Sequence, residues 1–125
     1  IGPQAQFYGY QDNSFVQEKM KSASIIVIPS IWQEPFGLVA AEAMSNGICI
    51  IASKVGGIPE IVQSNGVLIN NINCKKLSEK IDHLIRNEIL RKNYQRKAWK
   101  NFKFSSHISS ERLDHFRKVI FSNSD

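Results

Sequence analysis

Two carboxylates stand close together in the first half of the sequence, at Glu34 and Glu42. Carboxylates held at different heights along one site can each accept hydrogen bonds from a pair of neighbouring hydroxyls. Charged acceptors make hydrogen bonds about twice as strong as neutral ones. Neighbouring hydroxyls of this kind occur on a sugar ring and on a ribose. The pair therefore predicts a site that holds a sugar and a nucleoside.

Gly37 lies between the two carboxylates and opens a predicted helix that extends to about Ser45. The start of a helix presents unpaired backbone N–H groups and a partial positive charge, which suits a phosphate. Because Gly37 has no Cβ, a ligand can approach its backbone closely. A phosphate bound there would lie between the two carboxylates. Together these features describe a site for a sugar joined through a diphosphate to a nucleoside.

Each carboxylate also has a purely structural interpretation. Near a helix start, Glu34 can simply stabilise the helix dipole, which is worth about 0.3–1 kcal/mol. Glu42 can be an ordinary exposed residue of its helix. However, Glu42 is the lone acid in the otherwise apolar stretch 38–44. A charge in such surroundings indicates a partly buried carboxylate that has a partner.

The elements that must position this site follow from apolar runs separated by turn residues. We expect strands at 5–10, 24–29, 48–52 and 67–69, alternating with helices at 15–23, 37–45 and 60–63. The run from Ile25 to Ile28 is typical of a strand buried on both faces of a parallel sheet. Strands that alternate with helices predict a Rossmann-like parallel α/β sheet. In such sheets ligands bind at the carboxyl ends of the strands, which is where the loop at 30–35 begins.

The chain changes character after Asn73, where apolar residues recur at helical spacing. We expect three helices there, the second at 88–102 and the third at 109–121. The 125 residues suit a single domain. We therefore divide that domain into an α/β part at 1–73 and a helical tail at 74–125.

Composition and charge exclude several classes of protein. The chain is 42% hydrophobic, too apolar for disorder, and no apolar run approaches the ~18 residues of a membrane span. No secretion signal is visible at its start, so we expect a cytoplasmic location, with Cys49 and Cys74 reduced. Neither cysteine belongs to a metal-binding cluster, so no metal is expected.

The net charge of +5 arises mainly from residues between Lys75 and Lys118. A solvated helix face explains such a cluster, and so does the surface of an anionic membrane, which would place the chain peripherally at the inner membrane face. Nucleic acid is the other partner that a basic face allows. Nothing in the sequence resembles a recognition helix or an aromatic stacking platform, so no nucleic-acid partner is expected.

The stretch 34–44 resembles the E-x7-E signature of retaining glycosyltransferases of family four, which have the GT-B fold. Glu34 and Glu42 match its two glutamates, and 35–38 and 41–44 match the P-F-G-L and E-A-M segments that accompany them. Segments 7–10, 51–53, 56–62 and 66–69 are similar to four further motifs of the family, in the same order. The resemblance runs from about Phe7 to the mid-nineties.

The resemblance implies a role for each matching residue. Glu34 would hydrogen-bond the donor sugar and act in catalysis, and Glu42 would hold the ribose hydroxyls. The remaining donor contacts would come from the backbones of Phe36, Gly37, Leu38 and Val39 at the sugar and diphosphate, and of Gly9 and Tyr10 at the base. The donor would be a nucleotide sugar, its sugar would be transferred with retention, and neither a metal nor a cofactor would be needed. Cell-surface polysaccharide or lipopolysaccharide synthesis, with a lipid-linked acceptor, is the pathway that the family suggests.

The match to the family is incomplete. The Arg and Lys that grip the diphosphate, and the N-terminal acceptor-binding domain, have no counterpart in the sequence. The resemblance thus implies a partial C-terminal donor-binding domain, truncated at its N-terminal side, that does not transfer sugar alone. The alternative is a non-catalytic fragment or subunit that completes a partner chain.

Such a truncation would leave the strand at 24–29 with an unpaired edge. An unpaired edge invites pairing with another strand. We expect either a rearranged sheet, in which the strand at 5–10 lies beside it, or a strand-exchanged oligomer.

Overall fold

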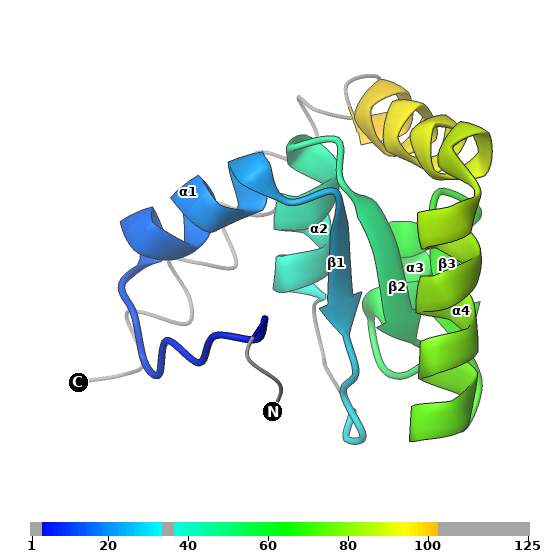
Figure 1. Cartoon of the computed structure of the whole chain (residues 1–125), viewed down its shortest axis with the longest axis horizontal. Helices are drawn as coiled ribbons and strands as arrows, with labels where there is room; N and C mark the ends of the chain where they lie inside the picture. Colours follow the sequence, from blue (N-terminus) through cyan, green and yellow to red (C-terminus); the bar gives the residue numbers. More distant parts are fainter. Residues whose placement is uncertain (1–3, 34–36, 103–125) are drawn as a thin grey trace.

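The computed structural model describes residues 4–33 and 37–102. Three parallel strands form one sheet with helices on both faces (Figure 1). The elements in order are α1 (Asn13–Ser22), β1 (Ile25–Ile28), α2 (Leu38–Ser45), β2 (Cys49–Ser53), α3 (Ile58–Val62), β3 (Val67–Ile69) and α4 (Cys74–Arg86). A further helix follows at 88–102, without a label in Figure 1.

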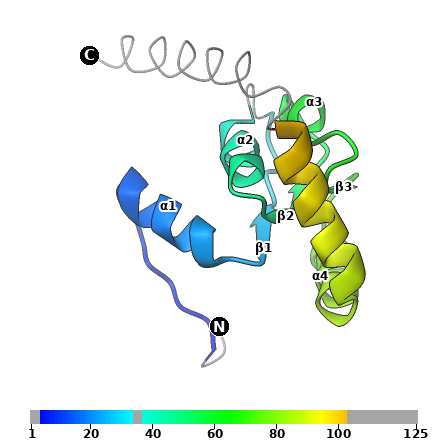
Figure 2. The same ribbon diagram turned by 90° about the horizontal axis from the view of Figure 1, so that it is seen from above.

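The central strand β2 organises both cores. The sheet order is β1-β2-β3, with Ile25 opposite Cys49 and Ile51 opposite Val67. Side chains alternate across a strand, so Ile50 and Ala52 pack with α2 and α3, whereas Cys49 and Ile51 pack with α4. Figure 2 shows these two helical layers from above, with the strands between them. Every residue of β2 is buried, as expected for a parallel strand covered on both faces.

The predicted α/β fold is confirmed, with element ends that differ by a few residues. The strand predicted at 67–69 has the same bounds as β3, and the helix predicted at 88–102 is present. The helix predicted at 109–121 lies outside the described residues.

Cys49 is buried and Cys74 is exposed, and both are free thiols. Burial raises the pKa of the Cys49 thiol to about 11, although the nearby Arg91 opposes the shift, so this thiol stays neutral.

The strand predicted at 5–10 is wrong, and so is the rearranged sheet that depended on it. In the part of the chain that the structure describes, β1 pairs with β2 alone. Residues 5–10 form no regular structure, Gly9 has a left-handed backbone angle, and Phe7 is 87% exposed. Apolar alternation specifies a strand only where a neighbouring strand accepts its hydrogen bonds, and Figure 1 shows this segment apart from β1. The strand-exchanged oligomer stays a prediction.

Gly66, in the turn before β3, allows the packing around β2 to be tested. A Cβ added at Gly66 would lie 2.9 Å from Val62 Cγ1 and 3.0 Å from the carbonyl oxygen of Ile50. The Ile50 carbonyl belongs to the central strand and cannot retreat without moving the sheet. We expect Gly66→Ala to destabilise the chain by about 1–3 kcal/mol, as overpacking does. Urea unfolding followed by circular dichroism measures this, with the exposed Ser64→Ala as control. Equal midpoints for the two variants would contradict the packing described.

Candidate functional site

The loops at the carboxyl edge of the sheet are tied to one another by polar contacts. The Ser53 hydroxyl, at the end of β2, donates to the carbonyl of Ile28, at the end of β1, over 3.4 Å. The backbone N–H of Gly56 donates to the Gln33 side-chain oxygen over 2.8 Å. Gln33 therefore joins the loop that follows β1 to the loop that follows β2. Gln33 is the last described residue before the segment 34–36.

Gly37 begins α2 in a left-handed conformation, with φ of 61°. A Cβ at this position would lie 3.2 Å from Ile61 Cγ1 and 3.3 Å from the carbonyl oxygen of Gly57. Glycine is therefore favoured twice, by the left-handed backbone angle and by the close approach of Ile61 and Gly57. The sequence interpretation assigned Gly37 to the approach of a ligand. The structure adds that Gly37 holds the start of α2 against the glycine-containing loop after β2.

The N-terminus of α2 differs from those of the longer helices. Asp12 caps α1 by accepting from the N–H of Phe15, and Asn73 caps α4 by accepting from Lys76. The cap position of α2 is Gly37, which provides no side-chain acceptor. The Ala41 N–H donates to the Gly37 carbonyl over 3.0 Å, so the amides of residues 38–40 precede the first hydrogen bond of the helix. Helix geometry leaves such amides without an intrahelical acceptor and concentrates partial positive charge there.

Glu42 lies on α2 at the contact with α1. Its carboxylate is half-buried and accepts a hydrogen bond from the Gln17 side-chain amide over 3.0 Å. The Gln17 oxygen in turn accepts from the Asn46 side chain over 3.4 Å. The prediction of a partly buried, partnered carboxylate is confirmed. Sequence reasoning missed Gln17, because a contact between residues 25 positions apart leaves no local signal.

Gly9 lines a groove between the N-terminal segment, α1 and β1, of about 360 Å³. Its described lining is Tyr8, Gly9, Gln11, Phe15, Val16, Lys19, Met20, Ala23 and Ile26. The Tyr8 and Phe15 rings meet edge to face at 5.1 Å, and the Lys19 ammonium lies 4.9 Å from the Tyr8 ring centre. A cation over an aromatic ring gives this groove both apolar and positive character. Tyr10 is fully exposed and does not line it.

The structure places the predicted site residues in two groups. Gly37, Leu38, Val39 and Glu42 lie together on α2, whereas Gly9 lies in the groove beside α1. α1 joins the groups, because its Gln17 contacts Glu42 while its Phe15 and Lys19 line the groove. Glu34 and Phe36 lie outside the described residues. Residues 4–33 and 37–102 contain no cluster of three potential metal ligands, and no described helix is long and apolar enough to cross a membrane.

The chain has a Rossmann-like α/β fold. Its three parallel strands are covered by helices on both faces, and α2 begins at the carboxyl edge of the sheet without a side-chain cap. Solved structures of glycosyltransferases share this fold. The C-terminal domain of a group 1 glycosyl transferase (LpcC) from Francisella tularensis superposes with a TM-score of 0.69 and 28% identity, over 82% of this chain and 52% of that one. HepE from Anabaena, solved in complex with UDP, superposes with a TM-score of 0.58 and 27% identity, over 74% of this chain and 29% of that one.

The sequence identifies the family directly, because residues 1–101 match the family of glycosyl transferases group 1. The chain belongs to that family. An uncharacterized glycosyltransferase of Methanocaldococcus jannaschii is 47% identical over 75 residues, which are 58% of this chain and 21% of the relative. The D-inositol 3-phosphate glycosyltransferase of Mycobacterium tuberculosis (strain F11) is 32% identical over 88 residues, 69% of this chain and 18% of that protein. The chain thus spans about a fifth of the length of these curated relatives.

The two ends of α2 provide a matched test of the role of Gly37. Gly37 and Gly47 both have left-handed backbone angles, of 61° and 64°. An added Cβ would be crowded by Gly57 at the first position and would meet the Trp99 Cβ at an ordinary 3.5 Å at the second. Both alanine variants are therefore expected to lose about 1–2 kcal/mol to backbone strain, and Gly37→Ala is expected to lose more.

Chemical denaturation of the two variants measures this difference directly. In addition, Gly37→Ala should move the backbone amide resonances of residues 56–57, whereas Gly47→Ala should leave them in place. Equal stability losses with undisturbed resonances would contradict the proposed contact between α2 and the loop.

Proposed function

We propose that this chain forms a donor-binding site for a nucleotide diphosphate sugar in a retaining glycosyltransferase of group 1. The observation that carries the proposal is the N-terminus of α2. It lies at the carboxyl edge of a parallel sheet, begins with a glycine and leaves its first amides without a side-chain cap from that position. Open α/β sheets bind ligands at this edge, and family membership makes a glycosyl donor the relevant ligand.

The diphosphate would be held by the first turn of α2. The amides of Leu38, Val39 and Ala40 precede the first helical hydrogen bond, which runs from Ala41 to Gly37. Such amides and the helix dipole together favour an anion. Val39 also leaves room for a ligand, because this residue is 47% exposed. Charge that develops on a departing diphosphate would be stabilised there.

Glu42 would accept hydrogen bonds from the ribose hydroxyls. A carboxylate offers about four acceptor positions, so it can accept from several donors, of which Gln17 is one. That contact also orients the carboxylate, because Gln17 is itself held by Asn46. An acceptor oriented in advance loses less entropy when a ligand binds.

The base would lie in the groove lined by Gly9. Tyr8 and Phe15 provide aromatic surface there, and Lys19 adds a cation. The structural similarity to HepE, solved with UDP, supports a nucleotide ligand. Glu34 would then hydrogen-bond the donor sugar, and the backbones of Phe36 and Tyr10 would complete the contacts that the family resemblance implies. No metal or cofactor is assigned to this site.

The transfer reaction is a property that we assign to the whole protein. The chain spans about a fifth of its curated relatives, so a separate acceptor-binding domain would supply the rest of the active site. Synthesis of cell-surface polysaccharide or lipopolysaccharide is the role that we propose for that protein. A non-catalytic subunit that completes a partner chain is the second candidate, favoured by β1, which pairs on one side only among the described residues.

Glu42→Gln tests the ribose contact. The substitution keeps the size of the side chain and an oxygen that can accept from Gln17, but it removes the charge. Hydrogen bonds to a charged group contribute about 1.5–3 kcal/mol, so we expect the affinity for the correct nucleotide to fall about 10- to 100-fold. Isothermal titration with a panel of UDP-, GDP- and ADP-sugars measures this and identifies the base.

Gln17→Ala is the matched control for this titration. It removes the hydrogen bond between α1 and α2, which Glu42→Gln can retain, but it leaves the carboxylate of Glu42 in place. We expect it to reduce affinity only a few-fold, because it disturbs the orientation of the carboxylate alone. If Gln17→Ala weakened binding as much as Glu42→Gln, the role of Glu42 would be structural and the proposal for this residue would fail.

A further inference from the structure

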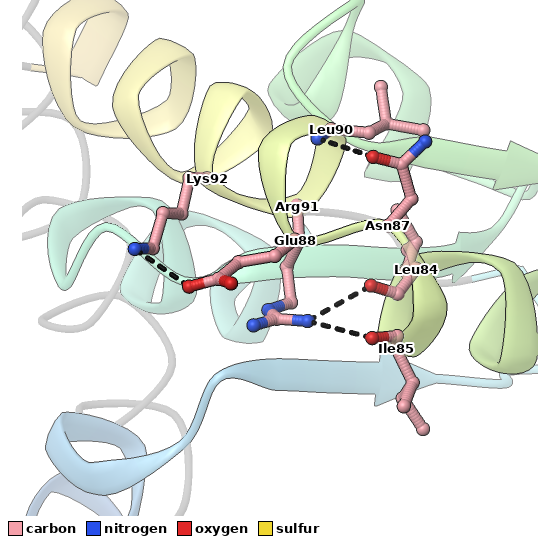
Figure 3. Close-up of polar contacts among 7 residues, drawn as sticks. All are labelled: Leu84, Ile85, Asn87, Glu88, Leu90, Arg91 and Lys92. Atoms are coloured by element: carbon pink, nitrogen blue, oxygen red, sulfur yellow. Dashed lines mark hydrogen bonds and ion pairs between the residues drawn. The ribbon is translucent and has the colours of Figure 1, made fainter.

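The helix at 88–102 is held in one orientation by contacts at its N-terminus, which Figure 3 shows. The Asn87 side chain accepts from the N–H of Leu90 over 3.1 Å and so caps the helix. The Arg91 guanidinium donates to the carbonyls of Leu84 and Ile85, the last turn of α4, over 3.1 and 3.3 Å. Cations favour the C-terminal end of a helix, so Arg91 fastens this helix to α4 and sets its rotation.

The inward face of the helix follows from that rotation. Leu90, Tyr94, Ala98 and Phe102 recur at intervals of four and pack against the two cores. The Gln95 side chain donates to the carbonyl of Ser24, which precedes β1, over 3.5 Å. The helix therefore lies at the amino edge of the sheet, opposite the start of α2. Figure 1 shows it at the top, with the strands pointing away from it.

The outward face carries cations whose charge nothing in the described chain offsets. Arg96, Lys97 and Lys100 are exposed and belong to no ion pair within residues 4–33 and 37–102. The one acid of the helix, Glu88, pairs with Lys92 over 2.8 Å, and this contact lowers the pKa of the Glu88 carboxyl. Positive charge is thus concentrated in the second half of the helix, which we call the basic face, defined by Arg96, Lys97 and Lys100.

Two further features of the basic face bear on its partner. The three cations, with Leu90, Asn93 and Tyr94, line a shallow depression of about 320 Å³. Large apolar side chains stand exposed on the same helix, Ile89 at 77% and Trp99 at 52%. At 3.6 residues per turn Ile89 shares the side of the helix that carries the cations, whereas Trp99 lies at the edge of that side, near Gly47. Cations flanked by an exposed tryptophan and an aliphatic residue are typical of surfaces that contact lipid headgroups and the acyl boundary beneath them.

We propose that the basic face binds the surface of an anionic phospholipid membrane. The three cations would contact lipid phosphates, while Trp99 and Ile89 would insert at the boundary of the apolar layer. The helix start, where backbone amides would suit a free phosphate, carries Glu88 instead, so the charge lies along an open helix face. An extended sheet of headgroups matches that geometry better than a single soluble anion. Because this face lies at the amino edge of the sheet, the membrane would leave the carboxyl edge open to a water-soluble ligand.

Vesicle sedimentation with the full chain tests the proposal. We expect binding to vesicles of phosphatidylcholine and phosphatidylglycerol in equal parts, no binding to phosphatidylcholine alone, and weaker binding as salt rises, because salt screens exposed charges. Each Lys or Arg near an anionic surface contributes about a factor of five in affinity. The triple variant Arg96→Gln, Lys97→Gln, Lys100→Gln is therefore expected to bind about 100-fold less tightly.

The control variant is Lys21→Gln, Lys75→Gln, Lys80→Gln, which removes three exposed cations from α1 and α4. It loses the same charge as the test variant and should retain most of its binding. Equal losses in the two variants would show that net charge alone attracts the chain and would overturn the proposal. In a Trp32→Phe background, Trp99 is the single tryptophan, and its emission should shift to the blue on anionic vesicles.

Two other outcomes would also overturn it. An unshifted Trp99 spectrum on vesicles that bind the chain would mean that another surface makes the contact. The second outcome is a chain that does not bind anionic vesicles but changes its Trp99 spectrum with another ligand. A change with inorganic phosphate would assign the basic face to a soluble anion, and a change with single-stranded RNA would assign it to nucleic acid.

Discussion

The close approach of Gly37 to the backbone of Gly57 is the constraint on which the carboxyl edge of this sheet depends. It favours a residue without a Cβ, at a left-handed angle, at the cap position of α2. With that contact made, the helix begins directly beside the loop that follows β2, and Gln33 ties the same loop to the one that follows β1. Three segments that are distant in the sequence thus converge at one end of the sheet.

The same constraint explains why the N-terminus of α2 has no side-chain cap from Gly37. A serine or aspartate at the start of α2 could cap the helix, as Asp12 does for α1, but either would bring a Cβ to about 3.3 Å from the Gly57 carbonyl oxygen, at a left-handed backbone angle. Glycine solves the packing problem and leaves the first amides of the helix available. The packing at this position and the proposed binding of an anion therefore favour the same residue.

The sequence predicted the parts of the fold that depend on local pattern. Runs such as Ile25 to Ile28 predicted buried strands, Gly37 and Gly47 predicted both ends of α2, and the spacing of Glu34 and Glu42 pointed to the family. Contacts across the fold were beyond prediction, because the pairing of Gln17 with Glu42 depends on how α1 packs on α2. The strand at 5–10 failed for a related reason: its residues suit a strand, but no described neighbour provides a ladder.

The two edges of the sheet have opposite surface chemistry. The carboxyl edge gathers backbone amides, a half-buried carboxylate and an aromatic groove, whereas the amino edge is covered by a helix whose outer face is basic. Arg91 holds the basic helix in place, because its guanidinium donates to the end of α4 and so fixes the helix at 88–102 there. It also lies near the buried thiol of Cys49. The arrangement separates a surface suited to lipid from a site suited to a soluble donor.

The central claim is that the first turn of α2 binds the diphosphate of a nucleotide. Titration of the isotopically labelled chain with UDP, GDP or ADP, each compared with its nucleoside, tests this through backbone amide chemical shifts. The account predicts that the amides of Leu38, Val39 and Ala40 shift with at least one nucleotide and stay in place with the nucleoside that lacks phosphate. Phosphate-dependent shifts confined to the basic face, with none at α2 under millimolar nucleotide, would contradict it.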